Sequence, residues 1–151
     1  MHSTIISDTS CFIILFNIGE LDLLHKIYQN IITTKEVADE FGQPLPEWIE
    51  IKTVKDISRQ RILEIEIDKG EASAIALALE TSESILIIDD YKARKVAEHL
   101  GLEFTGTIGI IIKAKQNGII NSIKPLLAKL RNTDFRFSPE IEIEALKLAG
   151  E

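Results

Sequence analysis

Residues 84–97, SILIIDDYKARKVA, decide the fold class of this chain. The first five residues form a continuous apolar run, which is typical of a strand buried on both faces at the centre of a parallel sheet. Asp89 and Asp90 end this run, and a helical pattern then begins at Tyr91 and is closed by Gly101. A buried strand that leads directly into a helix predicts a βαβ unit.

Short strands and helices alternate in both directions from this stretch, with no internal repeat and no linker. Strands are predicted at residues 4–7, 31–33, 48–54, 84–88 and 102–105. Helices are predicted at residues 11–15, 20–28, 34–41, 56–66, 68–79, 91–100, 107–116, 122–130 and 139–149. We therefore expect an α/β protein with a parallel sheet of four to five strands.

The composition fits one globular domain over residues 1–151, with 45% apolar and 27% charged residues. A single cysteine, Cys11, excludes an internal disulfide and a cysteine-rich zinc site, and we expect it to be buried packing. No apolar run approaches the ~18 residues of a membrane span, and the N-terminus lacks the pattern of a signal peptide. These features predict a cytoplasmic protein without a membrane partner.

The net charge of −7 is unevenly distributed along the chain. Residues 1–90 carry a net charge of −10, residues 91–134 carry +5 and residues 135–151 carry −2. An acidic and a basic part of one fold suit a cation beside a phosphate backbone. Solvated charges distributed by chance explain the same asymmetry.

Acidic residues stand where elements of the predicted sheet end or begin. Asp8 follows the first strand, Asp89 and Asp90 follow the apolar run, and Glu71 opens an alanine-rich helix. Glu40 lies near a helix C-terminus, where the helix dipole disfavours a negative charge unless solvent or a cation is close. Ligands of open α/β sheets bind at the carboxyl ends of the strands. Such a cluster would suit Mg²⁺ or Mn²⁺, which prefer oxygen ligands.

Each acidic position also has a purely structural interpretation. Asp8 is a suitable cap for the helix that follows it, and Asp68 with Glu71 fits the spacing of a capping box. One of Asp89 and Asp90 is expected to cap the next helix, which leaves the second without an explanation. The two interpretations stay open at this point.

The motifs of this chain, taken in order, resemble those of PIN domains. They are Ser7-Asp8-Thr9-Ser10, Val37-Ala38-Asp39-Glu40-Phe41, Gly70-Glu71-Ala72-Ser73-Ala74, Ile88-Asp89-Asp90-Tyr91-Lys92-Ala93-Arg94, Thr105-Gly106-Thr107-Ile108-Gly109 and Ala114-Lys115-Gln116-Asn117-Gly118. The resemblance covers residues 3–130 and is greatest to the PIN-like branch related to VapC toxins. It implies a three-layer α/β/α sandwich, with the helices of residues 122–149 packed on it.

The resemblance implies a metal-dependent ribonuclease that cleaves RNA with Mg²⁺ or Mn²⁺. The implied acidic residues are Asp8, Glu40, Glu71, Asp89 and Asp90, of which Asp8, Glu71, Asp89 and Asp90 are the expected metal ligands. Asp89 and Asp90 are alternatives for the functional carboxylate of their motif, and Asp90 has the spacing usual in the family. The residues expected to contact substrate are Thr9, Ser10, Lys92 and Arg94. Two departures from the family pattern are Glu71, where many members have aspartate, and Ile88, where a threonine is common.

Two alternatives to the ribonuclease remain. The first is a PIN-like module that binds RNA or protein without catalysis, since a fold alone does not establish an activity. The second is a phosphoacceptor domain. This alternative is less compatible, because such a domain needs an acidic pair after its first strand, whereas the acidic pair of this chain comes late, at Asp89 and Asp90. The resemblance also suggests a toxin with a small antitoxin, and a homodimer. Ile110, Ile111 and Ile112 would line the dimer face or, as we expect, fill the core.

Overall fold

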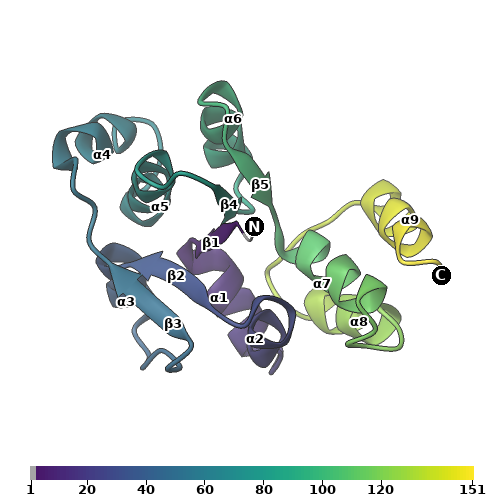
Figure 1. Ribbon diagram of the computed structural model, residues 1–151. Helices are drawn as coiled ribbons and strands as arrows, with labels where there is room; N and C mark the ends of the chain where they lie inside the picture. The colour runs from purple at the N-terminus through teal and green to yellow at the C-terminus, as the bar shows by residue number, and fades with distance from the viewer. Residues whose placement is uncertain (1–2) are drawn as a thin grey trace.

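The computed structural model describes residues 3–151 and places the strands between layers of helices (Figure 1). The strands are β1 (Thr4–Ser7), β2 (Ile31–Thr34), β3 (Ile49–Lys52), β4 (Ser84–Ile87) and β5 (Glu103–Thr105). The helices are α1 (Thr9–Asn17), α2 (Asp22–Tyr28), α3 (Lys35–Phe41), α4 (Ile57–Leu63), α5 (Lys69–Leu79), α6 (Tyr91–His99), α7 (Thr107–Gln116), α8 (Lys124–Arg131) and α9 (Pro139–Leu148). Every element predicted from the sequence is present.

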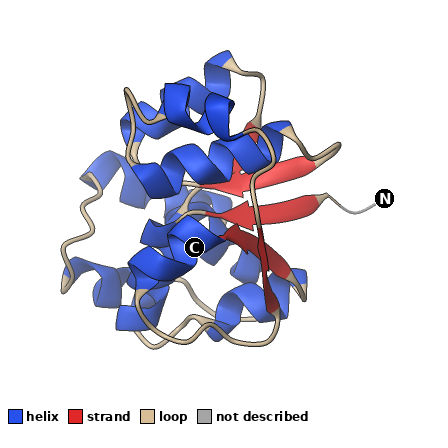
Figure 2. Ribbon diagram, turned by 90° about the vertical axis from the view of Figure 1, so that its left-hand side faces the viewer, coloured by secondary structure: helices blue, strands red, loops and turns tan. Residues whose placement is uncertain are grey.

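The five strands form one sheet in the order β3-β2-β1-β4-β5, and all neighbours pair in parallel (Figure 2). This topology confirms the predicted α/β class and parallel sheet. The sequence places the run of residues 84–88 at the centre, and this detail is wrong because β1 occupies the central position. An apolar run indicates that a strand is buried on both faces of the sheet. β1 and β4 are neighbouring interior strands, so this property does not tell which of them is central.

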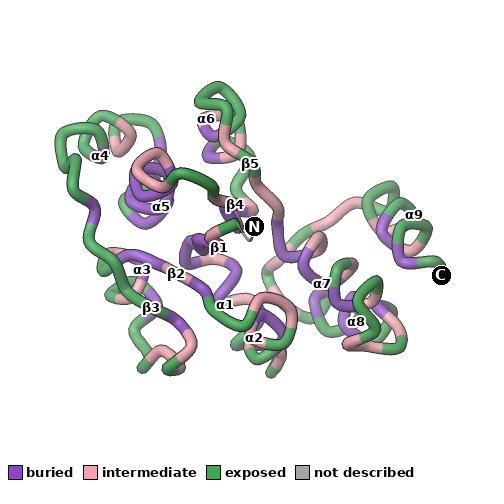
Figure 3. Tube along the Cα trace, in the orientation of Figure 1, coloured by how far each residue is buried: buried purple, intermediate pink, exposed green. Residues whose placement is uncertain are grey.

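Two apolar cores cover the two faces of the sheet. Neighbouring residues on a strand point to opposite faces, so Ile5 packs with α1 and α7 whereas Ile6 packs with α5. The α5 helix is buried along almost its whole length, because its alanines allow the helix to approach the sheet closely (Figure 3). Helices α4, α5 and α6 form one outer layer, and α1, α2 and α7 lie in the other. The expected three-layer sandwich is confirmed.

The C-terminal helices extend the layer that contains α1 and α7. Leu126, Leu130 and Ala145 belong to the same core as Ile110 and Ile111, which are fully buried. The free cysteine, Cys11, is buried in this core as the sequence predicts. Within residues 3–151, the helices are all too short or too polar to cross a membrane.

The carboxyl ends of β1, β2 and β4 lie at one edge of the sheet, where each strand leads into a helix. Ser7 of β1 pairs with Ile87 of β4, so the residues that follow these strands start side by side. The Asp8 backbone N–H donates to the Ile87 carbonyl at 3.1 Å. On the other side of β1, the Thr33 hydroxyl donates to the Ser7 carbonyl at 2.8 Å. Hydrogen bonds thus fix the backbone at the edge where the acidic residues were predicted.

Candidate active site at the carboxyl edge of the sheet

Asp8 is the most deeply buried carboxylate at this edge, with 0% of its surface exposed. It is the N-cap of α1, and its Oδ1 accepts a long hydrogen bond of 3.5 Å from the Cys11 N–H. Its Oδ2 is buried without a hydrogen-bond partner. Burial, together with the nearby charges of Asp89 and Glu71, raises the pKa of Asp8 well above its ordinary value. The predicted cap is therefore present, and one oxygen remains available for a ligand.

Thr9, Gly70 and Glu40 come together beside Asp8 although they belong to three different helices. The Thr9 hydroxyl is buried without a hydrogen-bond partner. A Cβ atom placed on Gly70 would lie 2.9 Å from Thr9 Oγ1 and 3.2 Å from Glu40 Oε1. Only glycine leaves this space open, because a real Cβ is never found so close to a neighbouring atom. The Glu40 side chain therefore reaches the start of α5, as its predicted role requires.

Glu71 is a buried member of the capping box that begins α5. Its N–H donates to Asp68 Oδ1 at 2.9 Å, and its Oε1 accepts from the Asp68 N–H at 3.4 Å. Burial, with the charges of Asp68, Asp90 and Glu40, raises the pKa of Glu71 to about 7. The capping box is confirmed, and the negative charges of Asp90 and Glu40 contribute to the raised pKa of Glu71.

Asp90 and Asp89 have separate structural partners. Asp90 is the N-cap of α6, and its Oδ2 accepts from the Ala93 N–H at 3.0 Å. Asp89 accepts two hydrogen bonds from Thr107, at 2.8 Å from the backbone N–H and at 2.6 Å from the hydroxyl. Gly106, the N-cap of α7, has no side chain for this purpose, so Asp89 serves in its place. This bond explains the second aspartate, which the sequence left without a structural reason.

The residues expected to contact substrate differ in how accessible they are. Ser10 is half-buried in the first turn of α1, and Lys92 is exposed on α6. Arg94 is half-buried, and its Nε donates to the Ile88 carbonyl at 2.8 Å while its guanidinium lies 5.3 Å from the Phe104 ring centre. Arg94 is thus anchored to the protein beside Asp89, whereas Lys92 extends into solvent.

Thr107 bonds to Asp89 at this edge, although the sequence assigns it no role at the site. The Thr105-Gly106-Thr107 motif belongs to the family resemblance, but its partner lies 18 positions earlier in the chain. One signal was available, since an apolar helix that follows glycine lacks a side-chain cap of its own.

A protein-family model for the PIN domain matches residues 4–151 of the chain. The chain belongs to the PIN domain family. A search of the curated proteins finds no match. PIN domains are generally nucleases that bind nucleic acid, and they typically use divalent metal ions. The match also includes α9, beyond the stretch over which the motifs are clearest.

Within residues 3–151 of this PIN domain, no three His, Cys, Asp or Glu side chains are arranged to hold a metal ion as they stand. Asp89, Asp90 and Glu71 each accept a hydrogen bond from a backbone N–H. The donors themselves still fit a hard cation. Asp8 Oδ2 is an unpartnered carboxylate oxygen, and Mg²⁺ is commonly held by one or two carboxylates and several waters.

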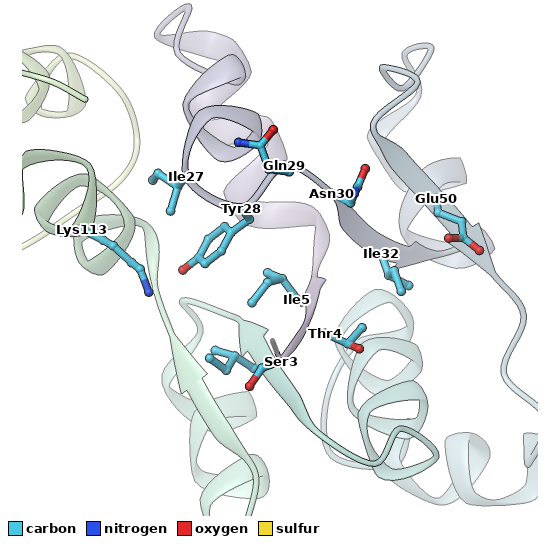
Figure 4. A pocket seen from close by; sticks show the side chains of 11 residues that line it. Ser3, Thr4, Ile5, Ile27, Tyr28, Gln29, Asn30, Ile32, Glu50 and Lys113 are labelled. Carbon is cyan, nitrogen blue, oxygen red and sulfur yellow. The ribbon is translucent and has the colours of Figure 1, made fainter. Parts of the chain in front are cut away.

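A larger cavity, of about 750 Å³, lies at the opposite edge of the sheet (Figure 4). It contains none of the predicted site residues. Its lining includes Ser3, Ile5, Tyr28 and Lys113, and the Lys113 amine lies 5.2 Å from the centre of the Tyr28 ring. The candidate active site of this PIN domain is therefore distinct from this cavity.

Proposed function

We propose that this PIN domain is a metal-dependent ribonuclease that hydrolyses phosphodiester bonds within RNA chains in the cytoplasm. The observation that supports it best is the buried Asp8 Oδ2, which has no hydrogen-bond partner. A buried carboxylate oxygen without a partner is costly, by about 1–3 kcal/mol or more. A cation with its bound waters would supply the missing partner, and the neighbouring carboxylates raise the local affinity for positive charge.

Asp8 would be the primary ligand, and Glu71, Asp89 and Asp90 would complete the set directly or through water. A bound Mg²⁺ or Mn²⁺ ion would polarise the scissile phosphate and lower the pKa of a water molecule. Glu40, whose carboxylate lies near Thr9 and Gly70, would add negative charge beside the residue that follows Asp8.

Other residues of the chain would position the RNA. Thr9 Oγ1 is unpartnered and Ser10 follows it at the start of α1, so both hydroxyls suit a phosphate oxygen or a water molecule. Lys92 and Arg94, on the helix after the acidic pair, would contact phosphates and position the strand without reading its sequence.

The second candidate function is a PIN-like module that binds RNA or protein without cleaving it. The observation that favours it is the engagement of three expected ligands, Glu71, Asp89 and Asp90, in hydrogen bonds that cap helices. In Asp89 both carboxylate oxygens are engaged by Thr107, whereas Glu71 and Asp90 each use one oxygen in these bonds. A module that had lost catalysis would keep the same bonds for stability alone.

Cleavage of single-stranded and structured RNA in Mn²⁺, Mg²⁺ or EDTA separates the two candidates. We expect cleavage in either metal and none in EDTA. Mutation of a residue that only hydrogen-bonds to a metal ligand typically lowers activity by ~10- to 100-fold. Asp8→Asn should reduce the cleavage rate by more than this, because Asp8 would be a ligand itself. Asp22→Asn is the matched control, because Asp22 is exposed on α2. RNA binding by the wild type in EDTA without cleavage in any metal would support the non-catalytic module instead.

The resemblance to the VapC-like branch leads to a further proposal, a toxin neutralised by a small antitoxin. Two observations together would support the toxin: expression of the wild type arrests cell growth whereas expression of Asp8→Asn does not, and a small gene lies beside the coding sequence. A homodimer is testable by light scattering. Ile110 and Ile111 are fully buried and Ile112 is half-buried, so these isoleucines belong to the core as expected.

A further inference from the structure

A second hollow, which we call the aromatic groove, adjoins Asp89 at the carboxyl edge of the sheet. Its volume is about 490 Å³, within the ~300–1,000 Å³ range of small-molecule sites. It lies between β5, the start of α7 and the segment that joins α8 to α9. Its side chains combine an acidic residue, two arginines and three phenylalanines, and they are Asp89, Arg94, Phe104, Phe135, Arg136 and Phe137.

The segment between α8 and α9 holds its side chains through local hydrogen bonds. The Thr133 hydroxyl donates to the Leu130 carbonyl at 2.6 Å and accepts from the Phe135 N–H at 3.1 Å. The Arg136 guanidinium donates to the Thr133 carbonyl at 2.7 Å. Phe135 and Phe137 lie 6.1 Å apart between ring centres. This wall of the groove is therefore preorganised, although it belongs to no helix or strand.

Glycines keep the opposite wall open next to the candidate active site. A Cβ atom on Gly106 would lie 2.6 Å from Asp89 Oδ1 and would overlap the Arg94 guanidinium. Gly109, one turn later, faces Thr105 in the same way. A side chain at position 106 would displace Asp89 or Arg94, and one at position 109 would displace Thr105. The groove thus adjoins the candidate active site at Asp89.

We propose that the aromatic groove binds an unpaired nucleotide of the RNA, adjacent to the phosphodiester bond that a cation held by the acidic residues would position. The base would stack on the phenylalanine rings or on the plane of an arginine, and the arginines would contact the flanking phosphates. The substrate is then single-stranded where it enters the groove. This inference rests on the RNA-binding part of the proposed function.

The chemistry of the lining favours a nucleotide over other ligands. Phenylalanine rings and guanidinium planes are the surfaces on which unpaired bases stack, and such stacking tolerates any base. Arg94 and Arg136 supply positive charge beside an otherwise acidic edge, as a phosphate backbone requires. Residues 91–134, which include α6, α7 and α8, carry a net charge of +5. A base that is paired in a duplex would have to leave its stack before it could enter.

Binding of fluorescent RNA in EDTA tests this inference without cleavage. The probes are mixed-sequence oligoribonucleotides of roughly 10 nucleotides, single-stranded or annealed to their complement. We expect the single strand to bind at least about tenfold more tightly than the duplex. Phe135→Leu, which keeps apolar volume but removes the ring, should weaken single-strand binding by about fivefold or more. Arg136→Gln should lower the slope of log affinity against log salt by about 0.7.

Matched controls are Phe16→Leu on α1 and Arg61→Gln on α4, both of which are exposed and lie outside the groove. If Phe135→Leu fails to fold, the exposed Arg136 carries the test. Equal binding of single strand and duplex, or groove variants that bind RNA like their controls, would overturn the inference. Asp8-dependent cleavage would stand in that case. If RNA binds in the groove but is not cleaved in any metal, the proposed ribonuclease activity is refuted and the proposed nucleotide-binding groove is retained.

Discussion

The raised pKa of Glu71 predicts a specific dependence of stability on pH. The carboxyl group holds its proton up to about pH 7 in the folded protein, against an ordinary value of 4.5 that applies to the unfolded chain. Between these values the folded state binds more protons than the unfolded state, so the free energy of unfolding falls as pH rises. One pKa unit corresponds to about 1.4 kcal/mol, and Glu71 thus removes about 3 kcal/mol across this window.

Glu71→Gln removes the charge and can keep the cap. Glutamine serves as well as glutamate at this position of a capping box, so its side-chain oxygen can still accept from the Asp68 N–H. We therefore compare the unfolding free energy of Glu71→Gln with that of the wild type at each pH. From pH 4.5 to pH 8 this difference should change by about 3 kcal/mol in favour of the variant. With a typical slope of ~1–3 kcal/mol per molar urea, the unfolding midpoint should differ by about 1–3 M.

Urea denaturation in EDTA at several pH values from 4.5 to 8 measures this difference. The pKa of Asp8 is raised in the same direction, but Asp8 is present in both proteins and its contribution largely cancels in the comparison. The control is Glu66→Gln, since Glu66 is exposed. Wild type and Glu71→Gln curves that run parallel over the whole pH range would refute the reasoning, because they would show that Glu71 titrates normally.

Three further predictions concern the same edge of the sheet. Saturating Mn²⁺ should raise the Tm of the wild type, by the equivalent of ~2.7 kcal/mol at 100 times Kd, and Asp8→Asn should reduce that rise; equal rises in a thermal shift assay would contradict the cluster. Thr107→Val removes the 2.6 Å bond to Asp89 and should lower the unfolding free energy by about 1–3 kcal/mol in urea, whereas an unchanged midpoint would mean that water replaces the hydroxyl. Gly70→Ala should lose stability by ~1–3 kcal/mol despite the better helix propensity of alanine, because its Cβ would press on Thr9; a more stable variant would show that this contact yields easily.

The elements of the fold were predictable because their signals are local. The capping box of Asp68 and Glu71 and the cap formed by Asp90 need only residues within one helical turn, and the structure has both. The identity of the central strand was not predictable in the same way. β1 and β4 are both interior strands, and the order of strands depends on pairing between distant parts of the chain.

The sequence indicates which acidic residues follow the strands of this edge, but not which hydrogen bonds they form. The unpartnered oxygen of Asp8 depends on what surrounds it in three dimensions, which no spacing reports. The bond between Asp89 and Thr107 joins two elements that meet only in the folded protein. Phe135 and Arg136, in the aromatic groove, lie outside the stretch that carries the family motifs, and their segment has neither helical nor strand periodicity.

The central position of β1 has a consequence for synthesis of the protein. Thr4 pairs with Ser84, so a ribosome that adds ~5–20 residues per second needs about 4–16 s after making β1 before its second neighbour, β4, exists. Asp8 and Asp89 are assembled only after that delay, and the wall that carries Phe135 and Arg136 is made later still. The edge that carries the acidic residues is therefore completed in two stages, first by the pairing of β1 with β4 and later by the segment that contains Phe135 and Arg136.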